Sequence, residues 1–120
     1  MIVLLSAVAT GRQGDASPVR VVHLVAERFV FTPSEITVTE GTTVEFRIRS
    51  EDTSHGFHLA GPGDLNVEIP KRGRGDVRVK FDARPAGVYI FECSRLCGAG
   101  HDFMRGQVRV VPKPSASTPE

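Results

Sequence analysis

Residues 44–49 read V-E-F-R-I-R, and their pattern is the clearest indication of the fold class. Val44, Phe46 and Ile48 occupy every second position, and charged residues stand between and after them. Successive side chains of a strand point to opposite faces, so this alternation predicts a strand with one buried and one solvated face. Glu40-Gly41, just before the stretch, predicts a turn.

The same period of two recurs on both sides of this stretch. Apolar residues alternate within residues 19–25, 36–38, 65–69, 77–81 and 108–111. Turn and breaker signals lie between these segments, among them Pro33, Gly61-Pro62-Gly63 and Pro85-Ala86-Gly87. No window has a convincing helical period. Short strands spaced by 8–12 residues, with turns between them, predict an all-β sandwich or barrel.

The length of 120 residues predicts one domain, and the formal net charge of +1 does not suggest a polyanionic partner, so we expect no binding of nucleic acid. Its two cysteines are too few for a disulfide framework. Residues 1–9 are nearly all apolar but are too few to span a membrane, which takes about 20. We expect a residual signal or anchor stump with a linker over residues 1–18, a folded domain over 19–112 and a disordered tail over 113–120.

Residues 93–104 read C-S-R-L-C-G-A-G-H-D-F-M and bring two cysteines, a histidine and a methionine into one loop. A second histidine, His55, lies far upstream in S-H-G-F-H. Thiolate, thioether and imidazole ligands together suit copper better than other common protein metals. The pattern predicts a copper site where loops converge at one end of the sandwich.

The residues alone leave four interpretations of this loop. A Cys93–Cys97 disulfide would contribute only about 2 kcal/mol and would not explain His101 and Met104. A tetrahedral zinc site from both cysteines, His101 and His55 leaves Met104 unused. A single blue copper takes two histidines, one cysteine and a weak methionine, which leaves one cysteine over. Two thiolates that bridge two copper ions, completed by both histidines, Met104 and a main-chain carbonyl of the loop, use all five side chains.

The loop resembles that of subunit II of the heme-copper cytochrome c oxidases. The stretches S-H-G-F-H (54–58), L-N-V-E (65–68) and P-A-G-V-Y (85–89) share the resemblance, which extends over about residues 29–111. It is closest to the bacterial branch with a single N-terminal anchor, and nitrous-oxide reductase carries a similar loop. The resemblance implies a cupredoxin-like Greek-key β-sandwich that holds CuA, a dinuclear, mixed-valence copper centre.

By position, the resemblance implies six copper ligands: His55, Cys93, the main-chain oxygen of Arg95, Cys97, His101 and Met104. Many members have a glutamate where this chain has Arg95, and a carbonyl ligand survives that change. The implied function is electron entry into a cytochrome c oxidase, with no bond made or broken on this chain. A cytochrome c or small copper protein would donate single electrons, and the heme centre of oxidase subunit I would accept them.

The implied location is the periplasm, at the outer face of the cytoplasmic membrane, with membrane association through a partner or a lost anchor. The alternative function is a free-standing exported copper carrier, a metallochaperone or a mononuclear cupredoxin on the same scaffold. Phe57, Tyr89, Phe91 and Phe103 lie near the ligands in sequence, and we expect them to pack in the core and keep water from the metal. His58 has the opposite strand parity from His55, which predicts a position at the surface or beside the ligands.

Overall fold

The computed structural model describes residues 17–61 and 63–114 of the chain. These residues form nine strands and one short 3-10 helix, η2. The elements are β1 (Val19–Glu27), β2 (Val30–Thr32), β3 (Glu35–Thr39), β4 (Thr43–Ser50), β5 (His55–Leu59), β6 (Leu65–Ile69), β7 (Val77–Asp82), β8 (Gly87–Glu92), η2 (His101–Phe103) and β9 (Arg105–Val111).

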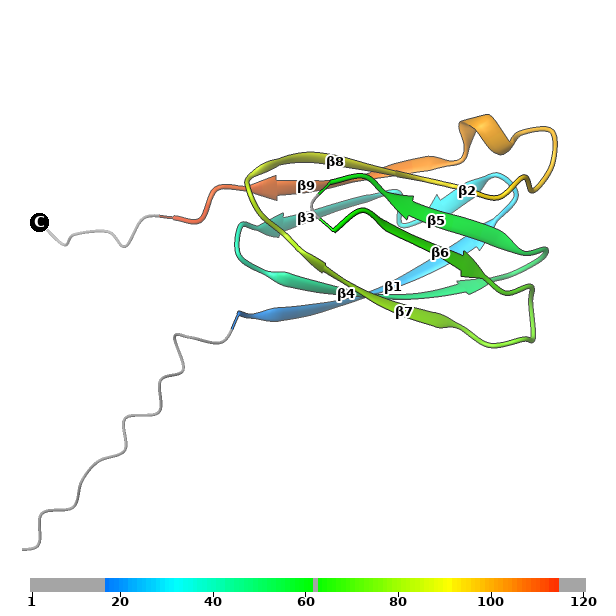
Figure 1. Ribbon diagram of the computed structural model, residues 1–120, viewed down its shortest axis with the longest axis horizontal. Coiled ribbons are helices and arrows are strands. Elements are labelled where there is room, and N and C mark those ends of the chain that lie inside the picture. The colour runs from blue at the N-terminus through cyan, green and yellow to red at the C-terminus, as the bar shows by residue number, and fades with distance from the viewer. Residues whose placement is uncertain (1–16, 62, 115–120) are drawn as a thin grey trace, which may run out of the picture.

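The strands form two sheets that pack face to face (Figure 1). One sheet has the order β2-β1-β4-β7 and the other the order β3-β9-β8-β5-β6. The pairs β1·β4 and β3·β9 are parallel, and the remaining pairs are antiparallel. Both sheets contain neighbours that are not consecutive in the chain, such as β1 beside β4 and β3 beside β9, and this crossed connectivity is that of a Greek-key sandwich. The predicted all-β sandwich is confirmed.

The alternating residues of β4 line the space between the sheets. Val44, Phe46 and Ile48 are fully buried, whereas Glu45 and Arg47 pair on the other face at 2.8 Å. Phe46 belongs to a cluster of four aromatic rings whose centroids lie 5.1 to 6.3 Å apart: Phe31, Phe46, Phe57 and Phe91. Each fully buried phenylalanine contributes roughly 1.5–3 kcal/mol through removal of its ring from water. The four rings belong to the same buried core as Cys93, Cys97 and Met104 of the loop.

The last strand and the loop before it differ from the sequence-based expectation. β9 begins at Arg105, earlier than the apolar alternation from Val108 indicates, because its first residues pair with β8 through their main chain. Helix η2 was not predicted, since three residues are too few for a periodic signal.

The ends of the chain are described only in part. Residues 1–16 of the expected stump and linker, and residues 115–120 of the expected tail, lie outside the described residues. Within the part that is described, no helix is long and apolar enough to cross a membrane.

Candidate metal centre

The cysteine-rich loop joins β8 to β9 and lies at the end of the sandwich opposite the start of β1 and the end of β9 (Figure 1). His55 is the first residue of β5, and β5 starts at this same end. The fold therefore brings an upstream residue to the last loop, as the sequence predicts.

Main-chain hydrogen bonds fold the loop back on itself. The N–H of Cys93 donates to the carbonyl of Met104 at 3.0 Å, which closes the loop between β8 and β9. Within the loop, the N–H of His101 donates to the carbonyl of Gly98 at 3.1 Å, and that of Met104 donates to the carbonyl of His101 at 3.2 Å. This closure turns the fully buried Met104 side chain toward the cysteines.

The two cysteines form the middle of the site. Their Sγ atoms lie 3.6 Å apart, and both are free, buried thiols, so the structure has no disulfide between them. On the side of Cys93, the Nδ1 atom of His55 lies 3.9 Å from Sγ, and the main-chain oxygen of Arg95 lies 3.0 Å from it. His55 is fully buried.

A second set of donors lies on the side of Cys97. The Nδ1 atom of His101 is 3.7 Å from its Sγ, and the Sδ atom of Met104 is 3.8 Å from it. His101 is partly exposed, unlike the upstream histidine. The structure thus brings all six residues that the sequence singles out into one site, in two sets of donors around a central pair of sulfurs.

The chemistry of these donors fits copper. The donor atoms of His55, Cys93 and Cys97 lie within 4.8 Å of one another, close enough to share a metal at bonds of roughly 2.0–2.3 Å. The thioether of Met104 is buried beside Cys97, and a thioether is a weak donor that copper accepts and structural zinc sites do not use. Most of the donor residues are also shielded from water: His55, Cys93, Cys97 and Met104 are buried, and both cysteines and Met104 belong to the same core cluster as Phe57 and Phe91.

The cysteines must lose protons before they can bind a metal. Burial raises the pKa of the Cys97 thiol to about 11, and the hydrogen bond and charge of Cys93 and the charge of Asp52 act in the same direction. The guanidinium of Arg28 acts against them. In the metal-free protein this thiol is protonated at neutral pH, so metal binding releases its proton.

Asp52 orients the upstream histidine. Its Oδ1 atom lies 2.7 Å from Nε2 of His55, which leaves Nδ1 directed toward Cys93. Partial burial favours the neutral carboxyl group, but hydrogen bonds from the main-chain N–H of Arg28 and from His55 hold the pKa of Asp52 below its usual value. A carboxylate on the far nitrogen fixes the ring of a ligating histidine and raises its basicity. Asp52 lies three residues before His55 in the sequence, and this spacing is the only local signal of its role.

The turn between β1 and β2 supports the second half of the loop. The Nε–H of Arg28 donates to the carbonyl of Cys97 at 3.0 Å. The ring of Phe29 lies against Gly98 and Gly100, where an added Cβ would come within 2.8 and 2.4 Å of it. Gly98 also has a φ of +145°, which other residues rarely adopt. No local sequence pattern marks these two turn residues as neighbours of a loop so far along the chain.

The β5–β6 hairpin supports the first half of the loop. A Cβ on Gly56 would lie 2.2 Å from Oγ of Ser94 and 2.9 Å from the main-chain nitrogen of Arg95, so the loop packs directly on the strand. The Ser94 hydroxyl donates to Asn66 at 2.8 Å, and the Arg95 guanidinium pairs with Glu68 at 2.6 Å. The side chain of Arg95 therefore points away from the metal site while its carbonyl points into it.

The prediction that four aromatic residues pack in the core near the site is correct for two of them. Phe57 and Phe91 are fully buried beneath the loop. Phe103 is 82% exposed, because η2 turns its side chain outward, so its expected place in the core is wrong. Tyr89 packs against Phe81 at 5.2 Å and is partly exposed. His58 is also partly exposed and lies 2.8 Å from Asp64, in line with its predicted surface position.

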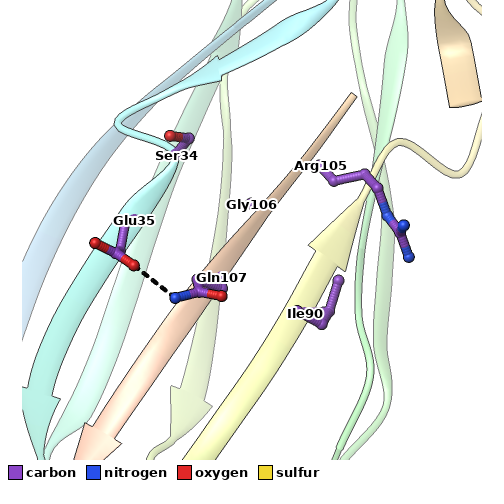
Figure 2. A pocket seen from close by; sticks show the side chains of 6 residues that line it. All are labelled: Ser34, Glu35, Ile90, Arg105, Gly106 and Gln107. Carbon is purple, nitrogen blue, oxygen red and sulfur yellow. Dashed lines mark hydrogen bonds between the residues drawn. The ribbon is translucent and has the colours of Figure 1, made fainter. Parts of the chain in front are cut away.

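A hollow of about 510 Å³ lies apart from the cysteines, between β3, β9 and β8 (Figure 2). Glu35 and Gln107, which are paired on the neighbouring strands β3 and β9, are joined there by a hydrogen bond of 2.5 Å. No cysteine or histidine of the described residues lines it, so this hollow is separate from the metal site.

Comparisons with known proteins place the chain in a family. No protein-family model matches the chain. The chain is 38% identical over 89 residues to cytochrome c oxidase subunit 2 of Thermus thermophilus, an alignment that covers 74% of this chain and 64% of the relative. The chain thus spans less than two thirds of that relative's length.

Two solved structures have the same fold. A chain of a heme-copper terminal oxidase dimer matches with a TM-score of 0.67 at 30% identity, over 81% of this chain and 67% of that one. The periplasmic domain of subunit II of cytochrome oxidase from Bradyrhizobium japonicum matches with a TM-score of 0.65 at 20% identity, over 77% and 83%. At that identity the second match supports the fold alone. The described residues form a cupredoxin sandwich, and the chain belongs to the cytochrome c oxidase subunit 2 family.

Proposed function

We propose that residues 19–112 form a CuA domain that passes single electrons into a cytochrome c oxidase. The observation that carries the proposal is the division of the donors around the cysteine pair. His55 and the Arg95 carbonyl lie beside Cys93, and a second imidazole and a thioether lie beside Cys97. Each half offers one imidazole and one weak ligand, which is what two ions bridged by two thiolates require.

The proposed ligands are His55, Cys93, the main-chain oxygen of Arg95, Cys97, His101 and Met104. Bound there, a pair of copper ions supplies one-electron redox chemistry. The chain's contribution is to hold the donors in fixed places next to the buried phenylalanine cluster and to exclude water. A rigid, dry donor set changes little between redox states, which lowers the reorganisation that electron transfer requires.

Electrons would enter through the face that carries the loop. His101 is the more exposed of the two proposed imidazole ligands. Leu96 and Phe103 of the same loop are 80% and 82% exposed, which offers an apolar surface for a partner. We propose a cytochrome c or small copper protein as donor and the heme centre of oxidase subunit I as acceptor. The corresponding location is the periplasm, at the outer face of the cytoplasmic membrane, with membrane association through a partner or a lost anchor.

Rapid mixing of the copper-loaded, oxidised chain with reduced cytochrome c tests this function. We expect fast oxidation of the cytochrome by the wild type and a large loss of rate in His101→Asn. His58→Asn is the matched control, because His58 bonds to Asp64 outside the donor set. No electron transfer, together with a single Cu(I) that a chelator removes readily, would favour a copper carrier instead.

A further inference from the structure

One arginine contacts both sides of the metal site from the turn between β1 and β2. The Arg28 guanidinium donates to the carbonyl of Cys97 at 3.0 Å, and the Arg28 main-chain N–H donates to Asp52 at 2.8 Å. Asp52 in turn lies 2.7 Å from His55. Arg28 is therefore bonded to the loop that carries the second cysteine and to the carboxylate that orients the upstream histidine.

The neighbouring residue strengthens this contact. The Phe29 ring covers Gly98 and Gly100 so closely that neither could carry a Cβ without displacing it. Together, the arginine and the ring hold the main chain between Cys97 and His101, which is the segment that carries one cysteine and one imidazole of the site.

The guanidinium of Arg28 lies beside the Cys97 carbonyl and not beside any carboxylate of the described residues. In residues 17–61 and 63–114, no acidic side chain forms an ion pair with its guanidinium. A guanidinium stays protonated at every physiological pH. Arg28 as a whole is exposed, but its Nε atom lies 3.0 Å from the carbonyl of the buried Cys97, so a positive charge lies at the solvent-facing edge of the site.

We propose that Arg28 is a positioning residue of the copper site, which fixes the main chain at Cys97 and raises the reduction potential of the centre through its charge. The inference rests on the proposed function. Reduction adds one negative charge to the site, and a nearby positive charge favours that state. Loss of the charge is expected to shift the equilibrium toward the oxidised centre on the order of tenfold, which is about 59 mV for a one-electron couple.

Redox titration of the copper-loaded wild type, Arg28→Met and Arg28→Lys tests the electrostatic part. We expect a lower potential for the methionine variant and a potential near that of the wild type for lysine, which keeps the charge. Arg20→Met is the matched control, because Arg20 lies near the other end of β1 and donates to the Thr37 carbonyl at 2.5 Å. It removes the same charge and the same kind of hydrogen bond far from the site.

Hydrogen exchange of the amides of residues 98–101 in the metal-free proteins tests the positioning part. We expect faster exchange in Arg28→Met than in the wild type or Arg20→Met. A wild-type potential in Arg28→Met, or unchanged exchange, overturns the inference.

If Arg28→Met loses copper, Arg28→Gln, which keeps a side-chain donor without the charge, is titrated in its place under the same criteria. If the wild type itself fails to bind two copper ions, the proposed function fails, and the exchange measurement still decides whether Arg28 positions the loop.

Discussion

The metal-free domain is expected to lose stability between pH 9 and pH 11, because its buried Cys97 thiol resists ionisation. The pKa of this thiol rises from 9.0 to about 11 in the folded protein. Below pH 9, the thiol keeps its proton in the folded and the unfolded chain, so its contribution to stability is fully present. Above pH 9 the unfolded chain loses the proton first, and the contribution falls until the folded thiol also ionises.

The size of this loss follows from the difference in pKa. Two pH units correspond to about 3 kcal/mol at most, at roughly 1.4 kcal/mol for each unit. Other groups titrate in the same range, so the informative quantity is the difference between the wild type and Cys97→Ser, whose hydroxyl does not ionise there.

Urea unfolding of both metal-free proteins, with a reductant and a chelator present, measures this difference. We expect the free energy of unfolding to fall more steeply with pH in the wild type than in Cys97→Ser between pH 9 and pH 11. The same pH dependence in both proteins would refute the burial argument. A steeper fall of the free energy of unfolding in Cys97→Ser would mean that burial of the thiol has the opposite effect on the pH dependence.

Three further substitutions test the support of the site. Gly56→Ala brings a Cβ within 2.9 Å of the loop's main chain, so we expect a loss of about 1–3 kcal/mol in thermal unfolding; unchanged stability would show that the loop moves freely. Asp52→Asn removes the carboxylate at His55, and chelator competition should show about 10- to 100-fold weaker copper binding, whereas Asp64→Asn, at His58, should have no effect. Met104→Leu should keep copper bound but shift the reduction potential, and an unshifted potential would argue against a thioether ligand.

The strands could be predicted because each has a buried and a solvated face. The alternation of Val44, Phe46 and Ile48 requires one face in the core, and all three are fully buried. The proximity of the two cysteines, the two histidines and Met104 could be expected from residue type, since thiolate, imidazole and thioether donors together suit copper. Their convergence depends on β5 starting where β8 ends, which follows from the sandwich topology.

The supporting contacts could not be predicted, because they depend on tertiary distance. Arg28 lies in a turn with no metal-binding pattern, and its bond to the Cys97 carbonyl appears only when the two sheets pack. The exposure of Phe103 could not be predicted either. Its apolar character suggests the core, but η2 directs it to solvent, and a helix of three residues leaves no periodic signal.

The copper content and the electron paramagnetic resonance spectrum of the loaded chain test the central claim most directly. Two donor sets around the Cys93–Cys97 pair predict two copper ions for each chain, with hyperfine structure shared over both nuclei. One copper ion with a single-nucleus pattern would contradict the dinuclear centre and leave the second cysteine without its proposed role.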